Sequence, residues 1–191
     1  MTESTTGTLT NPLHANLCDI LFTEEEIARR TSELGLQISK DYEGKNLVLV
    51  GILRGALIFL SDLSRSITVP HSWDMVGASS YHGGTGSSGR VQITKDVEVD
   101  LRDKHVLVVE DIYDSGRTLS AICDLLMVHR PLSVKVCTLL YKEKPERAAK
   151  TPIDYFGFRI KDKFVVGYGL DYEEMYRNLR MIGVLDPSIY S

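Results

Sequence analysis

The sequence predicts an α/β protein in which helices flank a central, mainly parallel sheet. Continuous apolar runs suit strands that are buried on both faces, and helix-like patterns alternate with these runs along the chain. At 191 residues, 43% hydrophobic and 25% charged, the chain is expected to fold as a single domain spanning residues 1–191. It contains no internal repeat and no linker long enough to divide it.

The first predicted helix begins at a capping box. Thr23 and Glu26 stand in the T-x-x-E pattern, and apolar residues at helical spacing continue to about Lys40. A continuous apolar run at 47–52 predicts a strand that is buried on both faces, and residues 56–65 resume a helical pattern. This half of the chain therefore contains a helix followed by a strand–helix unit.

The strand–helix pattern recurs later in the chain. It predicts a strand at 106–109, a helix from about Thr118 to His129 that ends before Pro131, and a strand at 134–141. Because strands that alternate with helices form parallel sheets, we expect these strands to lie in one sheet with the first.

Weaker β signals occupy the remaining segments. Apolar and polar residues alternate over 91–99, which predicts a half-exposed ribbon. Short β-like pieces are expected at 155–160, 164–168 and 181–185.

Composition and charge favour a small ligand. The formal net charge of -4 gives no general reason to expect a nucleic-acid or membrane partner. The three cysteines show no C-x-x-C spacing, so they indicate neither a disulfide framework nor a zinc site, and a reducing cytoplasm fits best. Residues 1–12 are polar, lack the apolar core of a signal peptide and are expected to be a disordered lead-in.

The segment VLVVEDIYDSGRTL combines a strand, an acidic pair and a turn that enters a helix. We expect Glu110 and Asp111 at the carboxyl end of the strand, where ligands gather in open parallel sheets. The turn suits an anion, because Gly116 permits consecutive amides to converge at a helix N-terminus. The predicted phosphate-binding residues are Asp114, Ser115, Gly116, Arg117 and Thr118.

An acidic pair beside a phosphate loop is best explained by a sugar phosphate. Carboxylates repel phosphate, but they accept hydrogen bonds from ribose 2′ and 3′ hydroxyls while the amides hold the 5′ phosphate. The simpler alternative is that the acids only end a strand and that Asp114 or Ser115 caps the next helix. The P-loop pattern G-x-x-x-x-G-K-[ST] is absent, and the G-x-G-x-x-G match at Gly84–Gly89 precedes a strand-like segment rather than a helix.

The segment EDIYDSGRTL resembles the phosphoribosyl-pyrophosphate signature of type I phosphoribosyltransferases. The resemblance extends from about Phe22 to Tyr190 and is strongest to the hypoxanthine-guanine branch of that family. It implies a sheet with a small hood, formed by terminal segments and a mobile loop. It also implies transfer of phosphoribosyl from 5-phosphoribosyl 1-pyrophosphate to hypoxanthine or guanine, giving IMP or GMP plus pyrophosphate. Two alternatives stay open: a nucleotide- or RNA-binding regulator of the same fold, and a xanthine-preferring enzyme.

The resemblance also implies roles for the phosphoribosyl and pyrophosphate sites. Glu110 and Asp111 would bind the ribose hydroxyls, and Asp114 would be the catalytic proton acceptor near purine N7. Leu53, Arg54 and Gly55 would form a pyrophosphate loop with a non-proline cis peptide, and Arg177 would be a further pyrophosphate contact. Many relatives carry Lys in place of Arg54, which puts the role of this side chain in doubt.

The purine, metal and lid roles are implied in the same way. Lys142 would donate to purine O6, Phe164 would stack on the base, and Val165 and Asp171 would complete the purine site. Read without the family, Lys142 is an ordinary solvated lysine and Phe164 a core residue. Mg²⁺ would be bound by Glu110, Asp111 and Asp171, Ser80 and Tyr81 would form a lid, and the chain would assemble as a homodimer or homotetramer.

Overall fold

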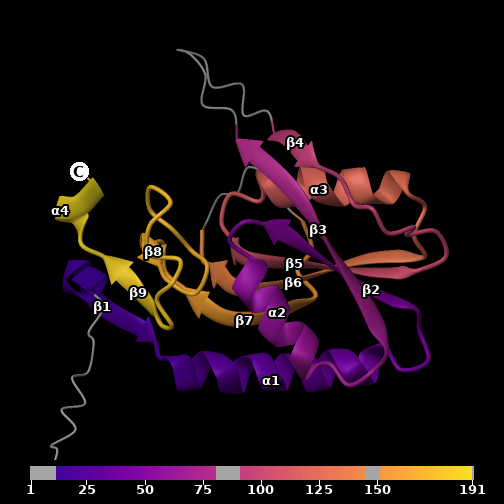
Figure 1. The fold of residues 1–191 in the computed structure, drawn as a ribbon, viewed down its shortest axis with the longest axis horizontal. Helices are drawn as coiled ribbons and strands as arrows, with labels where there is room; N and C mark the ends of the chain where they lie inside the picture. The colour runs from indigo at the N-terminus through magenta and orange to yellow at the C-terminus, as the bar shows by residue number, and fades with distance from the viewer. Residues whose placement is uncertain (1–11, 81–90, 145–150, 191) are drawn as a thin grey trace, which may run out of the picture.

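A computed structural model of the chain describes residues 12–80, 91–144 and 151–190 (Figure 1). The described residues form a six-stranded sheet in the order β4-β3-β2-β5-β6-β7 and a three-stranded sheet in the order β1-β9-β8. No helix among them is long and apolar enough to cross a membrane.

The large sheet is built from six strands. Every pair of neighbouring strands in it is parallel except one. Only β4 is antiparallel to its neighbour, β3. The strands are β2 (Leu47–Leu53), β3 (His71–Ser80), β4 (Val91–Lys95), β5 (His105–Tyr113), β6 (Ser133–Lys142) and β7 (Tyr155–Ile160). The predicted mainly parallel sheet is therefore confirmed.

Helices cover both faces of this sheet because its central strands are apolar on both sides. In β2, Leu47 and Leu49 belong to one buried cluster, whereas Val48 and Val50 belong to another. Helices α1 (Glu24–Asp41) and α2 (Leu57–Ser66) lie on one face, and α3 (Arg117–Val128) lies on the other (Figure 1). The capping box predicted at the start of α1 is present, with Glu26 N donating to Thr23 Oγ1 at 3.3 Å.

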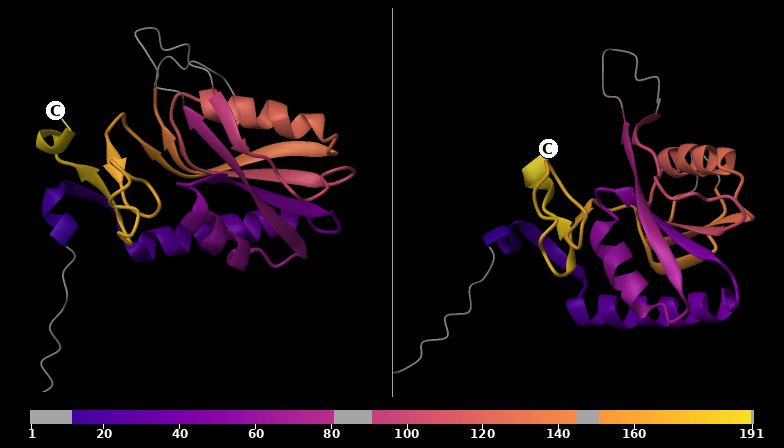
Figure 2. Two further views of the ribbon diagram at one scale, coloured as in Figure 1. Left: turned by 45° about the horizontal axis from the view of Figure 1, so that its top comes forward. Right: turned by 45° about the vertical axis from the view of Figure 1, so that its right-hand side comes forward.

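The small sheet forms a hood beside the carboxyl ends of the large sheet's strands (Figure 2). Its strands come from the two ends of the described chain, as the resemblance implied. They are β1 (Leu17–Phe22), β8 (Val165–Val166) and β9 (Ile182–Leu185). A 3-10 helix, η1 (Pro12–Asn16), precedes β1, and a short helix, α4 (Pro187–Tyr190), follows β9. Pro12 of the expected lead-in thus already begins η1, and the rest of that segment lies outside the described residues.

The structure changes several predicted bounds. Strand β5 runs to Tyr113, so Glu110 and Asp111 lie within the strand rather than directly after it. Strand β8 covers only Val165–Val166 of the predicted 164–168. The sequence patterns did not predict β1 or β3.

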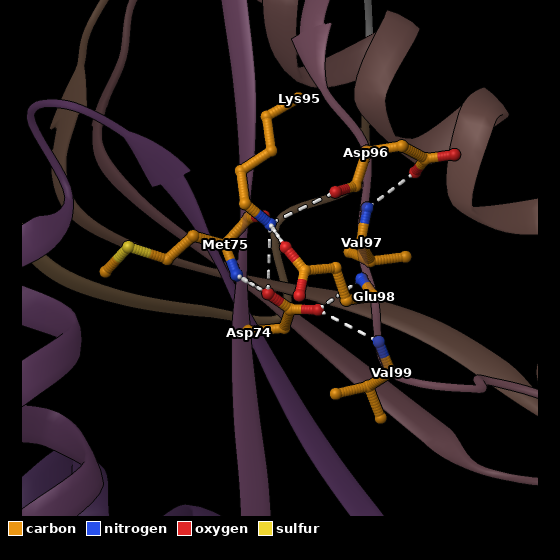
Figure 3. Close-up of polar contacts among 7 residues, drawn as sticks. All are labelled: Asp74, Met75, Lys95, Asp96, Val97, Glu98 and Val99. Carbon is orange, nitrogen blue, oxygen red and sulfur yellow. Dashed lines mark hydrogen bonds and ion pairs between the residues drawn. The ribbon is translucent and has the colours of Figure 1, made fainter.

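Strand β3 is joined to the segment after β4 by one carboxylate (Figure 3). Asp74 accepts hydrogen bonds from the amides of Met75 at 2.6 Å, Glu98 at 2.6 Å and Val99 at 3.0 Å. Lys95 Nζ lies 3.4 Å from the same carboxylate. Burial acts to raise the pKa of Asp74, but the amide bonds and Lys95 outweigh it and the pKa is lowered. These contacts stabilise the edge of the sheet at which β4 pairs with β3.

Candidate active site

A cleft of about 290 Å³ lies at the carboxyl ends of β2 and β5. This is the edge at which open parallel sheets bind their ligands. Most of the predicted site residues line it. Those that do are Leu53, Arg54, Gly55, Glu110, Asp111, Asp114, Ser115, Gly116, Thr118, Asp171 and Arg177.

The phosphate loop presents an uncapped helix N-terminus to this cleft. Gly116 is the N-cap of α3, has a φ of 77° and makes no side-chain cap. A positive φ of this kind favours glycine. Neither Asp114 nor Ser115 caps α3 as the simpler reading supposed, although Arg117 N lies 3.4 Å from Ser115 Oγ. The first amides of α3 are therefore placed to bind an anion.

The acidic pair is buried at the floor of the cleft. Asp111 is only 9% exposed, and Glu110 Oε2 is buried with no hydrogen-bond partner. Burial, and then the neighbouring Asp111 carboxylate, raises the pKa of Glu110 well above its usual range. Burial likewise raises the pKa of Asp111. Two adjacent buried carboxylates of this kind favour a ligand that donates hydrogen bonds or carries positive charge.

The donor set fits Mg²⁺ as part of a substrate complex. Mg²⁺ prefers oxygen ligands and is commonly bound by one or two carboxylates together with substrate phosphates and water. The unpartnered Glu110 Oε2 and the adjacent Asp111 offer such oxygens. Among the described residues, no group of three or more side chains forms a metal site by itself. The protein side of the site therefore suits a metal that arrives with phosphate.

The 53–55 loop closes tightly onto the acidic pair. The Leu53–Arg54 peptide is cis, as the resemblance implied. A Cβ added to Gly55 would lie 1.6 Å from Asp111 Oδ2, and a Cβ added to Gly169 would lie 2.1 Å from the Gly55 carbonyl oxygen. Only glycine at both positions allows the loop, the acidic pair and the hood to approach this closely.

Two arginines, Arg54 and Arg177, line the cleft. Arg177 Nη1 donates to the carbonyl oxygen of Gly169 at 2.8 Å, and its Nη2 lies 2.9 Å from Asp171 Oδ1. Glu174 pairs with Arg177 at 3.3 Å and also with Arg54. The sequence patterns did not single out Glu174, because nothing local indicates that it meets arginines from two separate loops.

Asp114 is held by two lysines at the rim of the cleft. Lys142 Nζ lies 3.2 Å from Asp114 Oδ2, and Lys144 Nζ lies 2.6 Å from Asp114 Oδ1. Both lysines also pair with Asp162, at 3.2 and 3.3 Å. Burial acts to raise the pKa of Asp114, but Lys144 and Lys142 outweigh it and the pKa is lowered. Lys142 is 8% exposed, which is unlike the solvated lysine of the simpler reading.

The two predicted hood residues differ in exposure. Val165 is 6% exposed and pairs with Val184 across the small sheet. Phe164 is 38% exposed, so its ring is not a core side chain. It meets the ring of Tyr172 edge-on, with the ring centroids 5.7 Å apart, and Tyr172 directly follows Asp171 in the chain. The ring of Phe164 is thus joined to the segment that lines the cleft.

Two further predicted positions, Arg117 and Ser80, lie at the ends of elements next to the cleft-lining residues. Arg117 is the first residue of α3, and Ser80 is the last residue of β3. Tyr81 and the Gly84–Gly89 segment lie outside the described residues, although a strand, β4, follows that segment as expected. A larger hollow of about 530 Å³ lies between α1, α2 and the hood, but no predicted site residue lines it. We therefore assign the chemistry to the smaller cleft.

The fold and the cleft define a class of open α/β proteins that bind a phosphorylated ligand at the carboxyl ends of parallel strands. Comparison with known proteins identifies the family. The phosphoribosyl transferase domain matches residues 19–173, and the chain belongs to this family.

Named relatives are similar over nearly the whole chain. The hypoxanthine-guanine phosphoribosyltransferase of Staphylococcus aureus is 49% identical over 180 residues, which are 94% of this chain and 99% of that protein. The protein of the same name from Streptococcus mutans is 44% identical over the same shares of the two chains. A crystal structure of a hypoxanthine phosphoribosyltransferase from Staphylococcus aureus superposes with a TM-score of 0.90 at 48% identity, covering 96% of this chain and 99% of that chain.

Proposed function

We propose that the chain is a purine-salvage enzyme that transfers phosphoribosyl from 5-phosphoribosyl 1-pyrophosphate to hypoxanthine or guanine. The products are IMP or GMP and pyrophosphate. One observation carries the proposal: a buried acidic pair, an uncapped helix N-terminus and the 53–55 loop, whose Gly55 packs directly against Asp111, line the same cleft. These parts suit the ribose hydroxyls, the 5′ phosphate and the diphosphate of one donor molecule. The names of the relatives support this choice of substrates.

The proposed reaction exchanges one bond at C1′ for another. The C1′–O bond to pyrophosphate breaks, and its electron pair leaves with the pyrophosphate. Purine N9 supplies the pair for the new C1′–N9 bond, and Asp114 accepts the proton from N7. General-base help of this kind typically contributes about 10²–10⁴-fold to the rate. Glu110 and Asp111 orient the ribose, and the first amides of α3 hold the 5′ phosphate.

Lys142 and Phe164 would provide base recognition. Lys142 would donate to O6 of the purine, which favours 6-oxopurines over adenine because adenine presents an amino donor at this position. Its 3.2 Å distance from Asp114 supports a common binding site for O6 and N7. Phe164 would stack on the base, and its 38% exposure leaves ring surface available.

Mg²⁺ would be held by Glu110, Asp111 and Asp171 with oxygens of the donor. It would supply positive charge that offsets charge on the departing pyrophosphate. The backbone of Leu53, Arg54 and Gly55 and the side chain of Arg177 would bind the diphosphate, and release of Arg177 from Asp171 would accompany donor binding. Ser80 and Tyr81 are proposed to belong to a loop that excludes water from the reacting sugar.

The same reasoning extends to assembly and location. We propose that residues 1–191 work as one domain, because the large sheet and the hood segment both line the cleft. We propose a homodimer or homotetramer from the family resemblance. A cytoplasmic location agrees with three free cysteines.

A base panel tests the proposal. The protein is incubated with 5-phosphoribosyl 1-pyrophosphate, Mg²⁺ and each of hypoxanthine, guanine, xanthine and adenine, and mononucleotide formation is followed. We expect rapid formation of IMP and GMP and little AMP. Faster turnover of xanthine would favour the xanthine-preferring alternative, and the absence of product from every base would favour a nucleotide-binding regulator.

A further inference from the structure

The C-terminal helix α4 places an aromatic ring against the proposed base-stacking residue. The rings of Phe164 and Tyr190 are stacked, with centroids 4.9 Å apart and an interplanar angle of 27°. Tyr190 also lies 6.3 Å from the ring of Tyr172. Phe164 and Tyr172, which directly follows the cleft-lining Asp171, therefore both contact one C-terminal side chain.

The chain is built so that this contact forms. Leu185 N donates to the carbonyl oxygen of Phe164 at 3.0 Å, which holds the backbone of Phe164 against β9. Asp186 then turns the chain: Ser188 N donates to its carboxylate at 2.8 Å, and Ile189 N donates to its carbonyl oxygen at 3.0 Å. The turn returns Tyr190 to the ring of Phe164. The last described residues thus fix both the backbone and the ring plane of Phe164.

The stack with Tyr190 occupies one face of the Phe164 ring, and Phe164 remains 38% exposed. Lys142 is the last residue of β6, in the large sheet. Helix α4 lies at the outer end of the hood, with β8 and β9 between it and the end of β6 (Figures 1 and 2). Tyr190, the last residue of α4, covers one face of the Phe164 ring, so a purine would stack on the other face.

We propose that Tyr190 is a positioning residue that backs the ring of Phe164 and thereby sets the affinity of the enzyme for its purine base. This inference rests on the proposed function. An unsupported phenyl ring at 38% exposure samples several orientations, whereas a ring stacked between a side chain and a base keeps one plane. The ribose and 5′ phosphate of the donor would bind at β5 and α3, and Tyr190 meets the segment next to Asp171 only through the ring of Tyr172 at 6.3 Å. Loss of the Tyr190 ring is therefore expected to change donor affinity less than purine affinity.

Steady-state kinetics of Tyr190→Ala, Tyr190→Phe and Ile189→Ala test the inference. Ile189 is in the same short helix and is 38% exposed, but it has no ring that could stack on Phe164. We expect Tyr190→Ala to raise KM for hypoxanthine about two- to tenfold while KM for the donor changes less than about twofold. Tyr190→Phe and Ile189→Ala should resemble the wild type in both constants.

Each other outcome overturns the inference. An unchanged KM for hypoxanthine in Tyr190→Ala would mean that the stack has no role in base binding. A lower KM would mean that Tyr190 occupies the face that the purine needs. Equal increases in both KM values, with the same effect in Ile189→Ala, would indicate only a loosened C-terminus. A wild-type protein that forms no mononucleotide from any purine would instead refute the proposed function.

Discussion

Replacing Gly55 by alanine is expected to damage the donor site more than the fold. Gly55 is not among the glycines with positive φ, so alanine is compatible with its backbone. The added Cβ, however, would lie 1.6 Å from Asp111 Oδ2, whereas ordinary contact begins at 3.4 Å. The carboxylate or the 53–55 loop must therefore move by about 1.8 Å. A displacement of about 1 Å at a reacting site can cost on the order of 10²-fold in rate.

The assay is mononucleotide formation at saturating hypoxanthine with varied donor. We expect Gly55→Ala to lower kcat/KM for 5-phosphoribosyl 1-pyrophosphate by about 100-fold or more. Gly44→Ala is the matched control, because Gly44 has a φ of 71° and its Cβ would meet nothing within 4 Å. That variant should lose about 1 kcal/mol of unfolding free energy with unchanged kinetics. A Gly55→Ala enzyme within about threefold of the wild type would refute the steric argument.

Two charge clusters allow predictions of pH dependence. Lys144 helps to lower the pKa of Asp114, so Lys144→Gln should raise that pKa. In a pH profile, kcat/KM of the variant should then begin to fall at a higher pH on the acid side than that of the wild type, with little change near neutrality. Acid sides of the two profiles that coincide would contradict this. Asp74 has a lowered pKa because it accepts amide bonds from Glu98 and Val99. Its stabilising effect is therefore complete above about pH 4 and is lost as the pH falls through the lower folded value. In denaturant titrations, Asp74→Asn should be about 1–3 kcal/mol less stable than the wild type near neutrality, and the difference should shrink below about pH 4. A difference that is independent of pH would show that the carboxylate charge is not involved.

The phosphate loop could be predicted because its chemistry is local. The acidic pair, Gly116 and the start of α3 lie within one short segment of the chain, and their residue types alone indicate a helix N-terminus near carboxylates. The parallel sheet could be predicted for a similar reason, since the apolar runs of β2 and β5 record burial on both faces. The prediction that the acceptor is a purine came from the family resemblance rather than from the chemistry of the residues.

Features that depend on long-range contacts were missed. Strand β3 contains Asp74 and Gly77, residue types that are depleted in strands, and it is stabilised by pairing with β2 and by the contacts of Asp74. Lys144 appears in the sequence as one charge in a mixed run, and only the fold brings it within 2.6 Å of Asp114. No sequence period records such a pairing.

The central claim is that this cleft performs the transfer with Asp114 as the proton acceptor. The most direct test compares kcat for IMP formation by the wild type and by Asp114→Asn from about pH 5 to about pH 9. Asparagine keeps the size of the side chain but cannot accept the proton from N7 as a carboxylate does. We expect kcat to fall by about 10²–10⁴-fold at every pH. Unchanged turnover across this range would contradict the account.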